Sequence, residues 1–319
     1  MKKFALSALL LSTSFAAAGG AGQPPAKTLQ LTAPIGTAVS YQTTTKVRVQ
    51  LGDVTVTARP GTEVDQEMLD LTRDALRQGF NQNMTQTATG QATYRVTGRD
   101  AAGNVTLTSA VTQNAPQTGN ITITVTERIT PSGQRQVTAL KTDSTDPQVR
   151  AIFAKLTPEQ LNAIGGQNGN GGSANLYGMP LVQGKSRTVT NSADIQGFLG
   201  GLMSSIPGAG SVDLKSSPLK ITETTTYNGL NAQGLHAFAA SSRLLDPWKI
   251  QLALPGGAGD MDLEVSNLNA KITQLYRRDG LLAGQQGNTN MQMRMTMTMD
   301  DQVVTITMNM QQEMTLKQK

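Results

Sequence analysis

Apolar and polar residues alternate along most of the chain after residue 36. From Thr37 to Leu51, Val, Tyr and Thr occupy every second position, the period-two pattern of a strand with one buried face. Similar segments recur between short runs of Gly, Asp, Asn and Pro, residues that favour turns. The further predicted strands are residues 54–58, 84–96, 105–111, 121–125, 134–140, 220–227, 235–240, 261–275, 281–284 and 290–316. Short turns between sequential strands predict an antiparallel sheet, because parallel neighbours need long crossover connections.

Specific turns follow from residues that tolerate unusual backbone dihedral angles. Gly52-Asp53 is predicted to turn the chain, so that residues 54–58 return beside residues 37–51. Asp300-Asp301 is predicted to divide residues 290–316 into the two strands of a hairpin.

The hydrophobic period changes between Glu63 and Gln78. Apolar residues recur there at spacings of three and four, with acidic residues early and arginines late, which predicts an amphipathic helix that ends at Gly79. The predicted apolar stripe consists of Val64, Met68, Leu71, Ala75 and Leu76. Two short helices are predicted within residues 146–164 and another over residues 193–203. The fold class expected is mainly β with a few helices: a large curved antiparallel sheet or open half-barrel packed on short helices.

The first residues have the three parts of a secretory signal peptide. Lys2 and Lys3 precede an apolar run over residues 4–11, and Ala16-Ala17-Ala18 offers small residues for cleavage. We therefore expect a signal peptide over residues 1–18 and a leader over residues 19–35. A single β-rich domain would follow over residues 36–319, with a Gly-rich linker at residues 165–173 between two half-domains. The expected location is periplasmic or secreted.

Composition narrows the classes of function. The chain has no cysteine, so disulfides, thiolate metal sites and a cysteine nucleophile are excluded. Its basic residues are scattered, and Arg277-Arg278 is the only adjacent basic pair beyond the signal peptide, which argues against nucleic-acid binding. No later segment has 18 consecutive apolar residues, so we expect no integral membrane helix.

Catalytic motifs are also missing from the sequence. His236 is the only histidine and lies within a predicted strand. The Gly-rich segments lack the phosphate-binding pattern with Lys and Ser or Thr, and the acidic residues lack calcium-loop spacing. We expect no enzyme activity, no cofactor and no metal site.

A methionine ladder is the most distinctive pattern. Met occupies every second position of one predicted strand, which places these thioethers on one face, and the return strand continues the pattern. The candidate ligand-facing residues are Met291, Met293, Met295, Met297, Met299, Met308 and Met310. Three interpretations stay open: a buried core, an adaptable apolar ligand surface, and a soft-metal site. The metal interpretation is the weakest, because the ladder extends over about 27 Å, too far for one ion, and we expect Cu(I) to bind weakly if at all.

Several segments resemble those of a family of exported bacterial β-rich proteins that is known only as a domain of unknown function. The resemblance lies in residues 36–49 and 92–107, in residues 221–240 with their Gly-Leu-His-Ala-Phe-Ala strand, and in the turn Arg278-Asp279-Gly280-Leu281-Leu282. Where such relatives carry Gly-Asp-x-Trp, this chain has Gly184-Lys185-Ser186-Arg187. The resemblance implies an open sheet similar to the half-barrel of periplasmic lipoprotein carriers, which hold acyl chains; a shared fold alone assigns no function.

Two functional hypotheses follow, with a third less favoured. The first is a non-catalytic cell-envelope protein that binds or carries an apolar or lipid-like ligand in a concave sheet. The second is a structural or protein-interaction protein of the envelope, whose partners would be other envelope proteins. A hydrolase built on carboxylates that meet only in the fold is the third.

Export gives the first testable prediction. Because small residues continue from Ala16 to Ala21, cleavage should leave a mature N-terminus between Gly19 and Gln23. Intact mass and N-terminal sequencing of the protein from its host measure this directly. Full-length protein that begins at Met1 and stays in the cytoplasm would contradict it.

Overall fold

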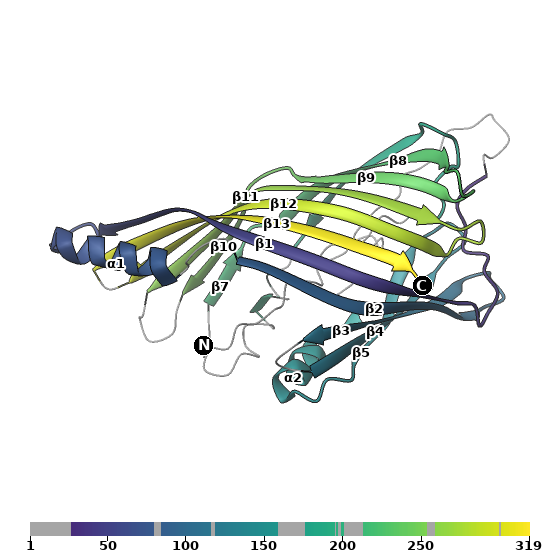
Figure 1. Cartoon of the computed structure of the whole chain (residues 1–319), viewed down its shortest axis with the longest axis horizontal. Coiled ribbons are helices and arrows are strands. Elements are labelled where there is room, and N and C mark those ends of the chain that lie inside the picture. Colours follow the sequence, from purple (N-terminus) through teal and green to yellow (C-terminus); the bar gives the residue numbers. More distant parts are fainter. Residues whose placement is uncertain are drawn as a thin grey trace.

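The computed structural model describes residues 27–79, 84–115, 119–158, 176–194, 196, 199–200, 213–253, 259–299 and 301–319. Strands account for most of these residues, and all of the strands belong to one 13-stranded antiparallel sheet (Figure 1). The prediction of a mainly β fold with one large antiparallel sheet and few helices is therefore confirmed. None of the described helices is long and apolar enough to cross a membrane.

The elements follow one another in this order along the chain. They are β1 (Ala38–Ala58), α1 (Gln66–Gly79), β2 (Met84–Arg99), β3 (Val105–Ala115), β4 (Gly119–Ile129), β5 (Arg135–Thr142), α2 (Pro147–Lys155), β6 (Ser186–Ala193), β7 (Asp213–Ser216), β8 (Leu219–Leu230), β9 (His236–Leu244), β10 (Trp248–Ala253), β11 (Asp260–Tyr276), β12 (Leu282–Met299) and β13 (Gln302–Gln318).

The first and last of the described strands pair at the centre of the sheet. The strand order is β5-β4-β3-β2-β1-β13-β12-β11-β9-β8-β6, and β10 lies beside β11 and carries β7 on its other side. The sheet is open: among the described residues, β5 pairs only with β4 and β6 only with β8. Neighbouring strands are mostly consecutive, as the short turns predicted, but the β1–β13 pair joins opposite ends of the sequence.

β1 contains a bulge where the sequence predicted a turn. Leu51 pairs with Met308 and Val54 with Ile306, so β1 has one more residue than β13 at this point and continues in the same direction. The Asp53 backbone N–H donates to Thr307 Oγ1 at 2.7 Å. A Cβ on Gly52 would lie 2.5 Å from the same oxygen. The predicted turn at Gly52-Asp53 is therefore wrong, because a residue of β13, distant in sequence, holds the two residues in a bulge.

Other strand boundaries also differ from the predictions. β12 is continuous from Leu282 to Met299, although residues 285–289 were not predicted to be strand; pairing with both β11 and β13 keeps this Gln- and Gly-rich stretch extended. Strands β6, β7 and β10 were not predicted from the sequence. β10 has the expected alternation, since Ile250 and Leu252 are buried, but it is only a few residues long.

The helix predicted over residues 63–78 is present as α1, which begins at Gln66 and not at Glu63, and α2 corresponds to the first helix predicted within residues 146–164. The second of those helices lies outside the described residues, apart from Thr157 and Pro158. The Gly-rich linker at residues 165–173 also lies outside them. So does most of the helix predicted over residues 193–203, whose first residue, Ala193, instead ends β6.

The main hydrophobic core lies at the end of the sheet away from α1. Segments 27–33 and 176–181 pair there, with Leu29 N–H donating to Met179 O at 3.0 Å and Gly178 N–H to Leu29 O at 2.8 Å. Leu29, Leu176 and Met179 are almost completely buried against residues of β1 to β4, β8, β9 and β11 to β13. The face of the sheet that packs on this core is called the inner face below.

Aromatic side chains anchor the core to the sheet. The Tyr41 hydroxyl donates to the Leu282 carbonyl and the Tyr177 hydroxyl to the Gly280 carbonyl, the latter at 2.9 Å. Phe238 and Tyr276 pack edge to face, with ring centroids 5.8 Å apart. Burial raises the pKa of the Tyr41, Tyr177 and Tyr276 hydroxyls, so all three stay protonated, and Tyr41 and Tyr177 act as hydrogen-bond donors.

Candidate functional site: the methionine face

The β12–β13 hairpin places the seven candidate methionines on the inner face, toward the α1 end of the sheet. Met291 lies directly opposite Met310, and Met293 opposite Met308. Side chains of directly opposed residues share a face, as do every second residue along a strand. We call these seven residues the methionine face: Met291, Met293, Met295, Met297 and Met299 of β12 with Met308 and Met310 of β13.

Neighbouring strands widen this apolar surface. Met295 lies between Ile306 of β13 and Leu263 of β11, and Met297 lies between Val304 and Met261. Beyond them, Val54 and Val56 of β1 and Ile250 and Leu252 of β10 continue the same rows. The neighbours on β1, β10 and β11 could not be predicted as parts of the site, because alternation shows which residues share a face within one strand but not which strands pair.

The methionine face is half-buried. Met299 is 38% exposed, and the other six are partly buried, none fully. Met295, Met297 and Met308 pack against a small cluster of fully buried residues, Val54, Val304 and Ile306. These contacts give the face a structural role at its α1 end. Its core and ligand-binding interpretations stay predictions.

Helix α1 covers part of this surface. Leu76 packs against the cluster of Val54, Val304 and Ile306, and Leu69 is 6% exposed. Met68 and Leu71, which the sequence analysis placed on the buried stripe, are 57% and 61% exposed, and Ala75 is also exposed. Successive residues are rotated by about 100° around a helix. Because Leu69 and Leu76 face the sheet, the stripe of Met68, Leu71 and Ala75 faces solvent. The predicted stripe is thus wrong for these three residues and right for Leu76, and its first member, Val64, lies before the helix begins at Gln66.

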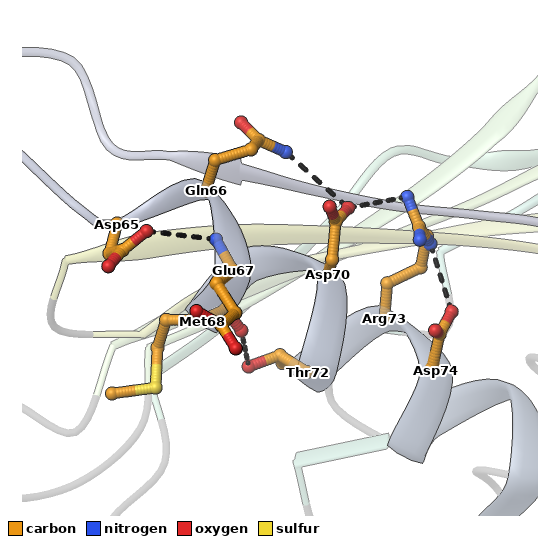
Figure 2. Close-up of polar contacts among 8 residues, drawn as sticks. All are labelled: Asp65, Gln66, Glu67, Met68, Asp70, Thr72, Arg73 and Asp74. Carbon is orange, nitrogen blue, oxygen red and sulfur yellow. Dashed lines mark hydrogen bonds and ion pairs between the residues drawn. The ribbon is translucent and has the colours of Figure 1, made fainter.

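Polar contacts fix the start of α1 and hold Arg73 (Figure 2). Asp65 Oδ1 accepts a hydrogen bond of 3.0 Å from the Glu67 backbone N–H, as an N-cap residue does. Arg73 forms ion pairs with Asp70 at 2.7 Å and Asp74 at 3.2 Å. These carboxylates therefore serve the helix itself. In the part of the chain that the structure describes, no three His, Cys, Asp or Glu side chains come together as a metal site.

A polar row crosses the inner face between the methionine face and the aromatic core. Gln312 of β13 lies opposite Thr289 of β12, followed across β11 and β9 by Ala270 and Ser242, and then by Glu223 of β8. Gln312, Thr289 and Glu223 are all buried. The apolar surface around the methionine face therefore has a defined polar boundary on its core side.

Glu223 is the charged member of this row. Thr225 Oγ1 donates to Glu223 Oε1 at 3.1 Å, and Ser242 Oγ donates to Oε2 at 3.4 Å. Burial lowers the pKa of the Arg187 guanidinium, and the negative charge of Glu223 acts in the opposite direction. These hydrogen bonds and the nearby arginine compensate for the cost of burying the Glu223 carboxylate, so the arrangement has a structural explanation.

His236 lies at the other end of the sheet, far from the methionine face. The Tyr227 hydroxyl and His236 Nδ1 share a hydrogen bond of 2.9 Å. Burial and the nearby Arg278 lower the pKa of His236, so the imidazole is neutral at neutral pH. Its contacts are those of a packed strand residue beside the aromatic core.

Comparisons with known proteins identify no family for this chain. No protein-family model matches it, and no curated protein matches it. Among solved structures, three mutants of Rh. blastica porin align with 87% of this chain and 100% of their own at 7% identity, with TM-scores of 0.19, 0.18 and 0.18. Similarity this low carries no argument about fold or function.

Burial decreases from Ile306 to Met295 to Gln292, so the loss of stability on truncation to Ala should decrease in the same order. Ile306 is fully buried, Met295 beside it is half-buried, and Gln292 on the opposite face of β12 is exposed. Ile306→Ala should cost about 2–5 kcal/mol of unfolding free energy, Met295→Ala roughly 1–2, and Gln292→Ala under about 0.5. Denaturant melts of the three variants measure this order. Equal small losses at Met295 and Gln292 would show that the methionine face makes no packing contribution.

Proposed function

We propose that this protein is a non-catalytic, exported cell-envelope protein that binds or carries an apolar or lipid-like ligand on the methionine face. In this proposal the open sheet works as a half-barrel packed on short helices, and the protein is periplasmic or secreted. The half-buried state of the methionine face is the observation that carries the proposal. A purely structural core would enclose these side chains, as it encloses Val304 and Ile306 beside them.

The chemistry and dimensions of the face support an elongated ligand. Methionine is flexible and polarisable, so a surface built from it adapts to irregular apolar shapes. From Met291 to Met299 the strand extends about 27 Å at about 3.4 Å per residue. The acyl chains of one bilayer leaflet occupy about 15 Å, half of the hydrocarbon thickness. An extended chain could therefore lie along β12 and end before the polar row of Gln312 and Thr289.

One observation favours the alternative of a structural or protein-interaction role. The outward stripe of α1 exposes Met68 and Leu71 on the same helix that covers the inner face. Two large apolar side chains one helical turn apart are typical anchors for a groove on a protein partner. In that case the methionine face would serve only as a packing surface for α1.

Native mass spectrometry of the protein purified from its own host separates the two proposals. A ligand carrier should retain a lipid-like mass that is released by mild activation. A mass equal to that of the polypeptide, with no lipid in an organic extract of the same sample, would favour the interaction role.

A variant pair tests whether the methionine face holds the ligand. Met291 and Met310 oppose each other outside the buried cluster, so Met291→Gln/Met310→Gln should change stability little and lower lipid retention at least severalfold. The control is Gln292→Ser/Asn309→Ser, an exposed pair on the opposite face of the same two strands. Equal retention by both variants would place the ligand elsewhere.

A further inference from the structure

The end of the sheet opposite α1 is bordered by a set of turns (Figure 1). Four of them are hairpin turns whose ends are joined by backbone hydrogen bonds of 2.8 to 3.0 Å. We call this set the turn rim and define it as residues 27–36, 99–104, 128–134, 182–185, 229–236 and 277–281. The segments of the rim are far apart in the sequence, from residue 27 to residue 281, so no short stretch of sequence contains it.

Backbone contacts show that the segments of the rim adjoin one another. Thr32 N–H donates to Asp279 O at 2.8 Å, and Gly184 N–H donates to Tyr227 O at 2.8 Å, next to residue 229. The Arg99 guanidinium donates to Leu31 O at 3.1 Å. A Cβ on Gly234 would lie 3.9 Å from the Arg278 guanidinium, and one on Gly103 would lie 3.3 Å from Pro131. The turn rim is therefore one surface.

The turn rim is strongly basic. It contains the basic residues Lys27, Arg99, Arg128, Lys185, Arg277 and Arg278 and the acidic residues Asp100 and Asp279. Both acids are already paired, Asp100 with Arg128 at 2.9 Å and Asp279 with Arg277 at 2.7 Å. Among the described residues, Lys27, Lys185 and Arg278 have no acidic partner within ion-pair distance and lie exposed.

Large aliphatic side chains are exposed on the same rim. Ile35 is 60% exposed, Val182 48% and Leu230 53%. Each lies in a turn or at the end of a strand, and Val182 and Leu230 come from neighbouring segments, because a Cβ on Gly229 would lie 3.1 Å from the Gln183 side chain. Aliphatic side chains on the same rim as unpaired cations suit a surface that offers both anions and hydrocarbon.

The opposite end of the molecule has the opposite charge. The segments that form α1 and the strand ends on that side contain ten acidic and six basic residues: residues 59–79, 213–216, 249–253, 260–264, 294–299 and 301. The molecule is thus electrically polarised along its strands. An anionic surface would attract the turn rim and repel the α1 end, which fixes the orientation of approach.

We infer that the turn rim docks on the surface of an anionic lipid bilayer. Lys27, Lys185 and Arg278 would contact lipid phosphates, and Ile35, Val182 and Leu230 would enter the boundary between headgroups and acyl chains. This inference goes beyond the proposed ligand site and does not depend on it, because the turn rim and the methionine face lie at different ends of the sheet.

Vesicle co-sedimentation of the purified full chain tests the inference. The protein should bind vesicles that contain phosphatidylglycerol and phosphatidylcholine, and binding should fall steeply between about 0.1 M and about 0.5 M salt because exposed charges are screened. It should not bind vesicles of phosphatidylcholine alone. Lys185→Gln/Arg278→Gln should lower the partition coefficient roughly tenfold or more. The matched control, Lys215→Gln/Lys271→Gln, removes two exposed lysines from the strands and should bind like the wild type.

A second variant tests the aliphatic contribution. Ile35→Ser/Leu230→Ser leaves every charge in place and should weaken binding severalfold while the salt dependence persists. Three results would each overturn the inference. They are equal binding to both kinds of vesicle, no binding to anionic vesicles, and an equal loss of binding in Lys185→Gln/Arg278→Gln and in its control Lys215→Gln/Lys271→Gln. Native mass spectrometry of the same variants should show unchanged lipid retention, so failure here leaves the proposed ligand site untouched.

Discussion

The pairing of β1 with β13 is the constraint on which the rest of the structure depends. It aligns Tyr41 with Gln318 and Ala58 with Gln302, so the two ends of the described chain form the centre of the sheet. A one-residue shift of this register would move every side chain of one strand to the other face. The bulge at Gly52 and Asp53, held by Thr307, keeps Val54 and Val56 on the same face as Tyr41 and Val39. Closing so long a loop is slow and costly in entropy, and burial of Val54, Val304 and Ile306 helps to offset it.

Because the register is fixed, the inner face is divided into zones along the strands. At one end Tyr41, Phe238 and Tyr276 pack with segments 27–33 and 176–181 in a buried core. A polar row through Gln312, Thr289 and Glu223 follows, and then the methionine face with α1 above part of it. Charge follows the same axis, basic at the turn rim and acidic around α1. The proposed ligand site lies at one end of the sheet and the proposed membrane-docking surface at the other. The same strands would therefore fix the distance and orientation between the two surfaces.

Local patterns predicted the parts of this structure that depend on nearby residues. Alternation identified the strands around Val39, Ile123 and Met295, and the change of period identified α1 with its end at Gly79. The bulge could not be predicted, because its cause is a hydroxyl group of Thr307, which is remote in sequence. The orientation of α1 was missed for a related reason: two apolar stripes are present, and contact with the sheet selects Leu69 and Leu76 over Met68 and Leu71. The seven methionines were placed together correctly by their spacing, whereas their neighbours on β1, β10 and β11 depend on strand pairing.

Disulfide trapping across β1 and β13 tests this account most directly, and the chain has no other cysteine to confuse the result. Lys319 N–H donates to Ser40 O, so Ser40 and Lys319 form a hydrogen-bonded pair. Hydrogen-bonded and non-hydrogen-bonded pairs alternate along an antiparallel ladder, so Thr45 and Met314, five positions further along, form a non-hydrogen-bonded pair. The Cα atoms of such a pair lie about 4.5 Å apart. Thr45→Cys/Met314→Cys should oxidise rapidly to an intramolecular disulfide. Thr45→Cys/Glu313→Cys should not, because these side chains point to opposite faces. Efficient cross-linking of the second variant but not the first, measured by mass and by mobility without reductant, would contradict the register and the inner face built on it.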